Sequence, residues 1–282
     1  MGNCLVTKLK AVVDNDNLEK FGVLVLKTTS KDQGAYKFGI IMQNPGTIDA
    51  VDGGTIKSYR SGGTTDTHQD IPAQTDSTWK AALSTESTFE LKNKYDLLTL
   101  TLFSDEYYDN FDLAQLKGCY NLGILIGCVS GNLSSISELA SLAYLNLERA
   151  NKSSKLKGDV SSLAALVNLA ILNINKNTAI TGSIADLGNL VNLTEFESRE
   201  TGVVGAVEEF VAAQIGNGRN NCESLSMIGY KTAITFNGSP AFPNASVKTL
   251  SWTRNTSTGA THIVLGEDSI DIVVDSDGNI VN

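Results

Sequence analysis

One apolar motif recurs along the chain and limits what the chain can fold into. Each copy has apolar residues at its first and fourth positions, and most copies also have one at the sixth, as in Leu169, Leu172 and Ile174. The first residues of the copies are Leu97, Leu122, Leu142, Leu169, Leu193, Leu225 and Val247. Successive copies therefore begin roughly 20 to 32 residues apart, a period typical of chains whose repeats stack as coils. This pattern predicts a solenoid.

Each copy also indicates its own local structure. Positions 4 and 6 alternate with polar residues, which is the period of a short strand. Upstream of the strand, apolar residues recur every third position, and this spacing suits a tight 3₁₀-like turn on an outer wall. A glycine precedes each of these runs by two residues, because a sharply bending chain favours a residue without Cβ there. These glycines are Gly131, Gly158, Gly182 and Gly205.

The motif resembles the leucine-rich repeat family over a little more than half of the chain. The resemblance is clearest from Thr181 to Leu190, which reads Thr-Gly-Ser-Ile-Ala-Asp-Leu-Gly-Asn-Leu. This stretch is similar to the repeats of plant receptors and bacterial proteins, although the proline that usually follows the isoleucine is absent. The resemblance implies a curved solenoid whose strand-lined inner face binds other macromolecules. It does not imply an enzyme.

The expected fold class is α+β or mostly β, in three parts. Residues 1–92 lie outside the repeat and contain β-rich runs such as Phe21–Leu26 between polar turns, which predict an antiparallel β anchoring domain. Residues 93–258 should form a leucine-rich-repeat solenoid of about seven coils. Residues 259–282 should form a capping β-hairpin, because the open end of a solenoid must be covered. An amphipathic helix is expected from Ala206 to Ile215.

Composition and charge exclude several function classes. The net charge is −9, with 22 basic and 31 acidic residues among 282. A general nucleic-acid binder needs a basic face, so no nucleic-acid partner is expected. No apolar run approaches the roughly 20 residues that cross a bilayer, and Met1–Val6 does not form a signal peptide. We therefore expect neither a transmembrane segment nor membrane insertion.

No pattern for catalysis, metal or cofactor binding is found. The four cysteines lack metal-ligand spacing, and buried thiols are the favoured interpretation. Asp275-x-Asp277-x-Asn279 imitates the start of a calcium loop, but Ile280 stands where glycine is needed, so a hairpin is preferred. The two histidines, His68 and His262, have no patterned nucleophile. We expect a protein that is not an enzyme and binds no cofactor or metal.

The candidate binding surface is the inner face of the central coils. Side chains at positions 3, 5, 7 and 8 should line it, and the set is polar, mixed in sign and includes one aromatic. The candidate residues are Tyr144, Asn146, Glu148, Arg149, Asn173, Asn175, Lys176, Glu195, Glu197 and Arg199. They favour a protein or glycan ligand, although the same residues could simply be the solvated surface of a stacking scaffold.

The N-terminal stretch suggests a biological setting. Cys4–Lys10, followed by an asparagine-rich turn and Phe21-Gly22, is similar to the N-termini of structural proteins from tailed, crAss-like phages of gut Bacteroidales. This resemblance implies a virion surface or fibre-associated protein. Such a protein would attach through residues 1–92 to other virion or surface proteins, with a homo-oligomer as one option, and would dock to proteins or recognise a host through the solenoid. The alternative is a bacterial leucine-rich-repeat binding protein in the cytoplasm or at the cell surface. A carbohydrate-active enzyme is the third interpretation, because Glu195 and Glu197 should share the inner face near Glu148, and paired carboxylates could serve a glycosidase.

Overall fold

The structure is a computed structural model that describes most of the chain from Leu24 onward. The described residues are 24–28, 36–42, 46–50, 56–59, 65–66, 70–71, 79–83, 87–91, 94–102, 111–148, 155–244 and 247–281. All statements below concern these residues. The N-terminal stretch Cys4–Lys10 and His68 lie outside them.

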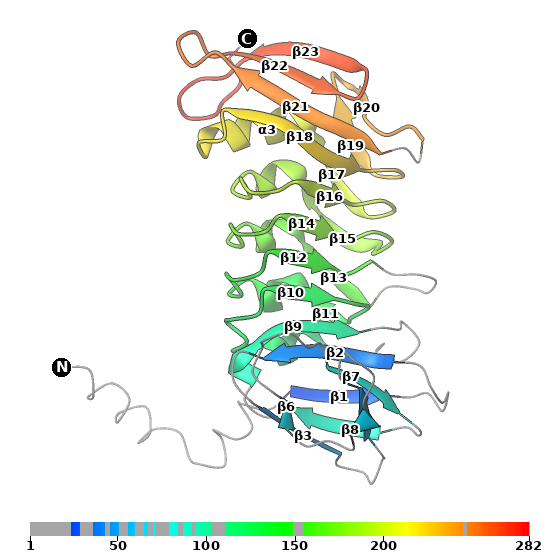
Figure 1. Ribbon diagram of the computed structural model, residues 1–282. Coiled ribbons are helices and arrows are strands. Elements are labelled where there is room, and N and C mark those ends of the chain that lie inside the picture. The colour runs from blue at the N-terminus through cyan, green and yellow to red at the C-terminus, as the bar shows by residue number, and fades with distance from the viewer. Residues whose placement is uncertain are drawn as a thin grey trace, which may run out of the picture.

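A 13-stranded mixed sheet runs along the length of the molecule (Figure 1). Its middle is a parallel series in which β9, β10, β12, β14, β16 and β18 pair in turn. At both ends the pairing is antiparallel, through β2 and β21. In spatial order the strands are β23 (Asp268–Val273), β22 (Ala260–Leu265), β21 (Lys248–Arg254), β18 (Asn221–Ile228), β16 (Glu195–Glu197), β14 (Ile171–Asn173), β12 (Tyr144–Asn146), β10 (Ile124–Ile126), β9 (Leu97–Leu102), β2 (Tyr36–Met42), β7 (Trp79–Leu83), β4 (Ile56–Tyr59) and β5 (Thr65–Asp66).

Two smaller sheets complete the β structure. The first has six strands and is parallel except at its last pair. Its strands are, in order, β11 (Gly131–Asn132), β13 (Leu156–Asp159), β15 (Ala179–Ser183), β17 (Gly202–Ala206), β19 (Ala233–Phe236) and β20 (Ser239–Pro240). The second has four strands, in the order β1 (Leu24–Thr28), β8 (Ser87–Leu91), β3 (Gly46–Ala50) and β6 (Asp70–Ile71).

Short 3₁₀ turns follow the strands of the six-stranded sheet, as the period of three predicted. η3 (Leu133–Ile136), η4 (Val160–Leu163) and η5 (Ile184–Leu187) follow β11, β13 and β15, η2 (Leu113–Leu116) follows the isolated bridge residue Asp112, and η1 (Lys94–Asp96) lies before β9. Each turn from η2 to η5 begins at a polar residue whose side chain accepts a hydrogen bond from the backbone two residues on. After β17, the helix α3 (Val207–Gly216) takes the place of a 3₁₀ turn, which confirms the helix predicted from Ala206 to Ile215.

The core lies between the two long sheets and the wall of turns. Leu145, Leu172 and Leu250, the fourth residues of their copies, are each 0% exposed. Leu145 and Leu172 pair in adjacent parallel strands, but Leu250 pairs with Leu225 in the antiparallel strand β21. The burial predicted for these leucines is confirmed, whereas the predicted place of Leu250 in a further parallel coil is wrong.

The predicted fold class is wrong. A leucine-rich-repeat solenoid of about seven coils was expected after a separate β domain and before a separate hairpin cap. The chain is instead mostly β, with two large mixed sheets, no closed barrel among the described strands and one α-helix in the described part. The physical reason is that an apolar spacing does not depend on strand direction. Leu250 and Trp252 keep the pattern although β21 runs against β18.

The long sheet also crosses the predicted boundaries. β2, from the first 92 residues, pairs with β9 from Phe38–Leu102 to Met42–Leu97, and β22 and β23 extend the same sheet at its other end. Backbone hydrogen bonds therefore join the expected parts. Whether 1–92, 93–258 and 259–282 are domains that fold by themselves stays a prediction.

Candidate binding face

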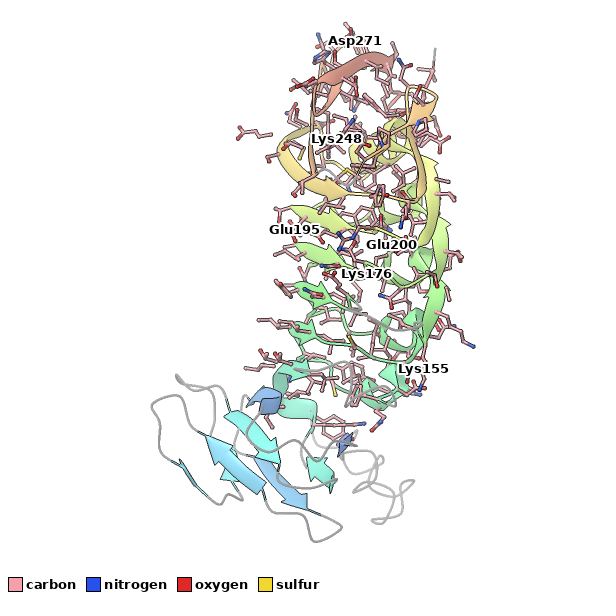
Figure 2. All side chains as sticks on the ribbon, turned by 90° about the vertical axis from the view of Figure 1, so that its right-hand side faces the viewer. Lys155, Lys176, Glu195, Glu200, Lys248 and Asp271 are labelled. Atoms are coloured by element: carbon pink, nitrogen blue, oxygen red, sulfur yellow. The ribbon has the colours of Figure 1, made fainter. Side chains whose placement is uncertain are left out.

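The candidate site lies on the outward side of strands β12, β14 and β16. Leu145, Leu172 and Phe196 point into the core, so their neighbours in each strand point the other way. The parallel register then aligns Tyr144 with Ile171 and Glu195, and Asn146 with Asn173 and Glu197. We call this surface the polar face; its residues are Tyr144, Asn146, Glu148, Asn173, Asn175, Lys176, Glu195, Glu197 and Arg199. Figure 2 shows Lys176, Glu195 and Glu200 at neighbouring levels of the stack.

Asparagine amides link the carboxylates of the polar face across the strands. The Asn173 Nδ2 atom donates to Glu197 Oε2 at 3.0 Å and to Glu148 Oε2 at 3.3 Å. Asn175 Nδ2 donates to the same oxygen of Glu197 at 2.5 Å. One amide thus holds two acidic side chains from different levels of the stack, which fixes their orientation.

Two cations converge on the other oxygen of Glu148. Lys176 Nζ lies 3.0 Å and Arg199 Nη2 lies 3.2 Å from Glu148 Oε1. The three side chains are about one-third exposed, so water screens these ion pairs only in part. The backbone N–H of Arg199 donates to Asn175 Oδ1 at 2.7 Å, while the buried Arg199 Nε has no partner.

The two central carboxyl groups differ in pKa. Burial alone would raise the pKa of Glu148, but the hydrogen bonds from Lys176 and Asn173 and the two nearby positive charges together lower it. Burial raises the pKa of Glu197, and the negative charges of Glu195 and Glu148 add to that rise against the hydrogen bond from Asn175. The polar face therefore favours the charged form of Glu148 and disfavours that of Glu197.

The residue at the edge of each level adopts a left-handed conformation. Lys176, Glu200 and Lys231 have φ values of 62°, 56° and 56°. Their backbones turn sharply here, and Lys231 Nζ lies 3.7 Å from Glu200 Oε1. The buried Asn177 fixes the turn after Lys176 by donating to the carbonyls of Leu147, Ile174 and Asn175. The turns present charged side chains at successive levels of the stack.

The structure brings most of the predicted candidates together. Nine of the ten lie on the polar face, and Arg149 lies outside the described residues. Two of the asparagines are buried within this face, since Asn173 is 6% and Asn175 1% exposed. They connect the charged groups instead of offering free amides. That these residues bind a partner stays a prediction.

Sequence reasoning missed a cleft at the C-terminal end. Its volume is about 570 Å³, and its lining comes from α3, β23 and the segments around them. The lining residues are Ala206, Glu208, Glu209, Asn237, Ile270, Asp271, Ile272 and Ile280. The repeat offers no signal for this cleft because its walls are more than 60 residues apart in the sequence, from Glu208 to Ile270.

The other residues considered for chemistry have structural surroundings. Asp275 accepts hydrogen bonds from the backbone of Asp277 and Asn279, which shapes the turn after β23. His262 Nδ1 lies 2.7 Å from Asp271 Oδ1 on the exposed side of the sheet. Burial raises the pKa of the Cys119 thiol to about 11, which leaves it protonated at neutral pH. Within the described ranges, no group of three or more His, Cys, Asp or Glu side chains is placed to hold a metal ion.

No protein family matches this sequence, and no curated protein matches it either. In the part of the chain that the structure describes, no helix combines the length and apolar character that a membrane crossing requires. The proposals below therefore rest on the geometry of the chain itself.

Proposed function

We propose that this chain is a non-enzymatic structural or binding protein that recognises a protein or a glycan through its polar face. The observation that supports this most is the network around Glu148, where side chains from three levels of the stack are held by one another while still about one-third exposed. Side chains ordered before binding lose little conformational entropy when a partner arrives. Such a surface is suited to polar recognition.

The chemistry of the face favours a polar macromolecule over a lipid. Its charges are mixed in sign, and Tyr144 lies in register with Ile171 at one side of the charged network. Tyrosine and arginine are enriched where binding energy concentrates. Carboxylates, amides and a guanidinium in fixed positions match the hydrogen-bonding groups of a protein surface or a sugar. Tyr144 and Arg199 are therefore the proposed anchors.

Binding of the labelled chain to whole bacterial cells tests this proposal. Replacing both Tyr144 and Arg199 by alanine should reduce cell binding at least tenfold, because the contact loses an aromatic and a charged anchor. Treating the cells with protease or with periodate beforehand distinguishes a protein from a glycan partner. Thermal unfolding of each variant shows whether the fold is retained.

The matched control replaces Tyr120 and Lys157, an exposed aromatic residue and an exposed cation that lie off the long sheet. This control variant should bind like the parent chain. If the Tyr144 and Arg199 variant binds like the parent, or if the control loses binding equally, the polar face is not the recognition surface.

We further propose that the chain acts on the surface of a virion, as the resemblance of its first 25 or so residues to phage structural proteins implies. Those residues lie outside the described ranges. Mass spectrometry of purified phage particles tests this proposal. The chain should be found in stoichiometric amounts with capsid or tail proteins. Its absence from particles would favour the alternative of a bacterial binding protein.

A further inference from the structure

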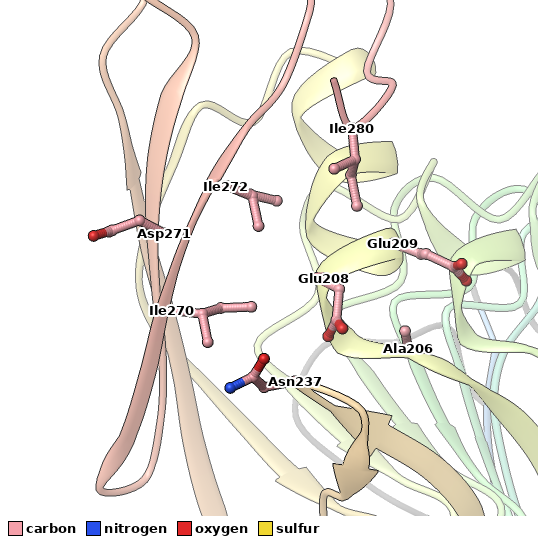
Figure 3. A pocket seen from close by; sticks show the side chains of 8 residues that line it. All are labelled: Ala206, Glu208, Glu209, Asn237, Ile270, Asp271, Ile272 and Ile280. Carbon is pink, nitrogen blue, oxygen red and sulfur yellow. The ribbon is translucent and has the colours of Figure 1, made fainter. Parts of the chain in front are cut away.

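The cleft at the C-terminal end has an apolar wall and a carboxylate without a partner. Ile270 and Ile272 of β23 point across the cleft toward α3, and Ile280 closes one end of it (Figure 3). Glu208, in the first turn of α3, points toward Asn237 at the other end. Glu208 Oε2 is inaccessible to water and accepts no hydrogen bond. None of the residues that line the cleft is cationic.

Glu208 lies in the first turn of α3. α3 begins at Val207, and its N-cap residue, Ala206, makes no side-chain hydrogen bond to the helix. The free N–H groups of the first turn favour a negative charge beside them. The cleft therefore suits a ligand with an aliphatic stem that lies along the isoleucines and a positive end that reaches Glu208, as a lysine side chain has.

The strand beside the cleft has an open edge. β23 is the last strand of the long sheet, and its only strand partner in the described part is β22. After Val273, the edge is covered by Val281, whose N–H donates to the Val273 carbonyl at 2.8 Å. From Asp268 to Ile272, the edge of β23 opposite β22 pairs with no described strand. An extended segment could bind along this edge and place alternate side chains over the cleft.

The chain itself contains a segment of this chemistry. Residues 1–13 hold two lysines and no acidic residue, within a chain of net charge −9. In an extended segment Lys8 and Lys10 lie on the same side, and Leu5, Leu9 and Val12 supply aliphatic neighbours. The segment is thus complementary to the cleft in both charge and apolar character.

We propose that the N-terminal segment of one copy binds in the C-terminal cleft of a second copy, with its lysines directed at Glu208. Because the cleft lies at the C-terminal end of the chain and its ligand is the N-terminal segment, the contact between two copies is head-to-tail. Further copies can then join the same assembly one after another. Binding within one chain is disfavoured by distance. The 16 residues from Lys8 to Leu24 span at most about 55 Å, and β1, which begins at Leu24, lies at the opposite end of the molecule from β23 (Figure 1).

Sedimentation velocity of the full chain over a range of concentrations tests the proposal. The mass of the parent should rise with concentration, and Glu208→Gln and the Lys8→Gln/Lys10→Gln pair should each shift the distribution to the monomer. Asp271→Asn is the matched control, because it also removes one negative charge beside the cleft, while the Asp271 side chain in β23 points away from Glu208 and the isoleucines (Figure 3). This variant should associate like the parent.

Two further measurements do not depend on how well a variant folds. A synthetic peptide of residues 3–13 should dissociate the parent oligomers, and the same peptide with glutamine at both lysine positions should not. A chain with Glu208→Lys should co-sediment with a chain carrying Lys8→Glu and Lys10→Glu. A parent mass independent of concentration, an inactive wild-type peptide, or equal effects of Asp271→Asn and Glu208→Gln would overturn the proposal. None of these outcomes bears on the polar face, which is tested separately.

Discussion

At the scale of single residues, each recurring glycine lies against a capping side chain of the preceding repeat. Gly182 has a φ of +108°, and a Cβ there would overlap Asp159 Oδ1, the side chain that caps the preceding 3₁₀ turn. The same relation joins Gly131 to Asp112 and Gly205 to Ser183. The glycine thus meets two demands, an unusual backbone angle and a close neighbour. Sequence analysis predicted the first demand alone.

Replacing Gly182 by alanine should lower the free energy of unfolding by about 2–4 kcal/mol, because backbone strain and overlap with Asp159 add together. Gly218 is the control, since its φ is +93° and nothing lies within 4 Å of a Cβ built there. Gly218→Ala should therefore cost only the strain, about 1–2 kcal/mol. Chemical denaturation measures both values, and equal losses would contradict a role for the overlap.

Glu148 should make stability depend on pH. Because its pKa in the folded chain is lowered, its contribution is complete above its ordinary pKa of 4.5 and is lost as the pH falls through the lowered folded value. Glu148→Gln should cost about 1 kcal/mol at pH 7, since Lys176 and Arg199 lose their shared partner. The parent and this variant should converge once the pH falls below the lowered folded pKa of Glu148. Denaturation at several pH values measures the difference.

Glu197→Gln is the contrasting variant on the same face. The pKa of Glu197 is raised, so its contribution is present below its ordinary pKa of 4.5 and is lost as the pH rises through the higher folded value. Removing this charge should therefore leave stability at pH 7 unchanged or higher. A loss as large as that of Glu148→Gln would show that the amide bridges, and not the charges, dominate the network.

At the scale of elements, the alternation of buried and exposed side chains along a strand decides which substitutions destabilise the fold. In β14, Leu172 is 0% exposed, and the neighbouring Ile171 lies on the half-exposed polar face. Leu172→Ala should destabilise the fold by about 2–5 kcal/mol, through lost burial and the cavity left behind. Ile171→Ala should cost less than about 1.5 kcal/mol. Thermal unfolding distinguishes them, and the reverse order would mean that the strand faces the other way.

At the scale of the whole molecule, the N-terminal strands cover one end of the parallel series. β2 pairs along β9, where Leu97, Leu100 and Leu102 are buried. Removing residues 1–93 should expose β9 as an open edge and cause aggregation, whereas removing only residues 1–23 leaves the β2 pairing in place. Size-exclusion chromatography compares the two truncated chains. A monomeric, stable chain of residues 94–282 would instead support the domain boundary predicted at residue 92.

The sequence by itself determined the local features that repeat. Apolar spacing predicted the buried positions, the 3₁₀ turns, α3 and the grouping of nine candidate residues on one side of three strands, because each depends on periodicity within a short segment. Even the backbone role of Asn177 follows from the turn beside it.

Only the tertiary structure decided strand direction, sheet extent and the partners of individual side chains. β21 keeps the apolar spacing of the repeat yet runs antiparallel, and β2 joins the sheet from outside the repeat, because hydrogen bonding between strands is not encoded in side-chain period. The burial of Asn173, the shared oxygen of Glu148 and the C-terminal cleft likewise arise from contacts between distant segments. Periodicity identifies which side of a strand faces the core; packing alone determines what it meets there.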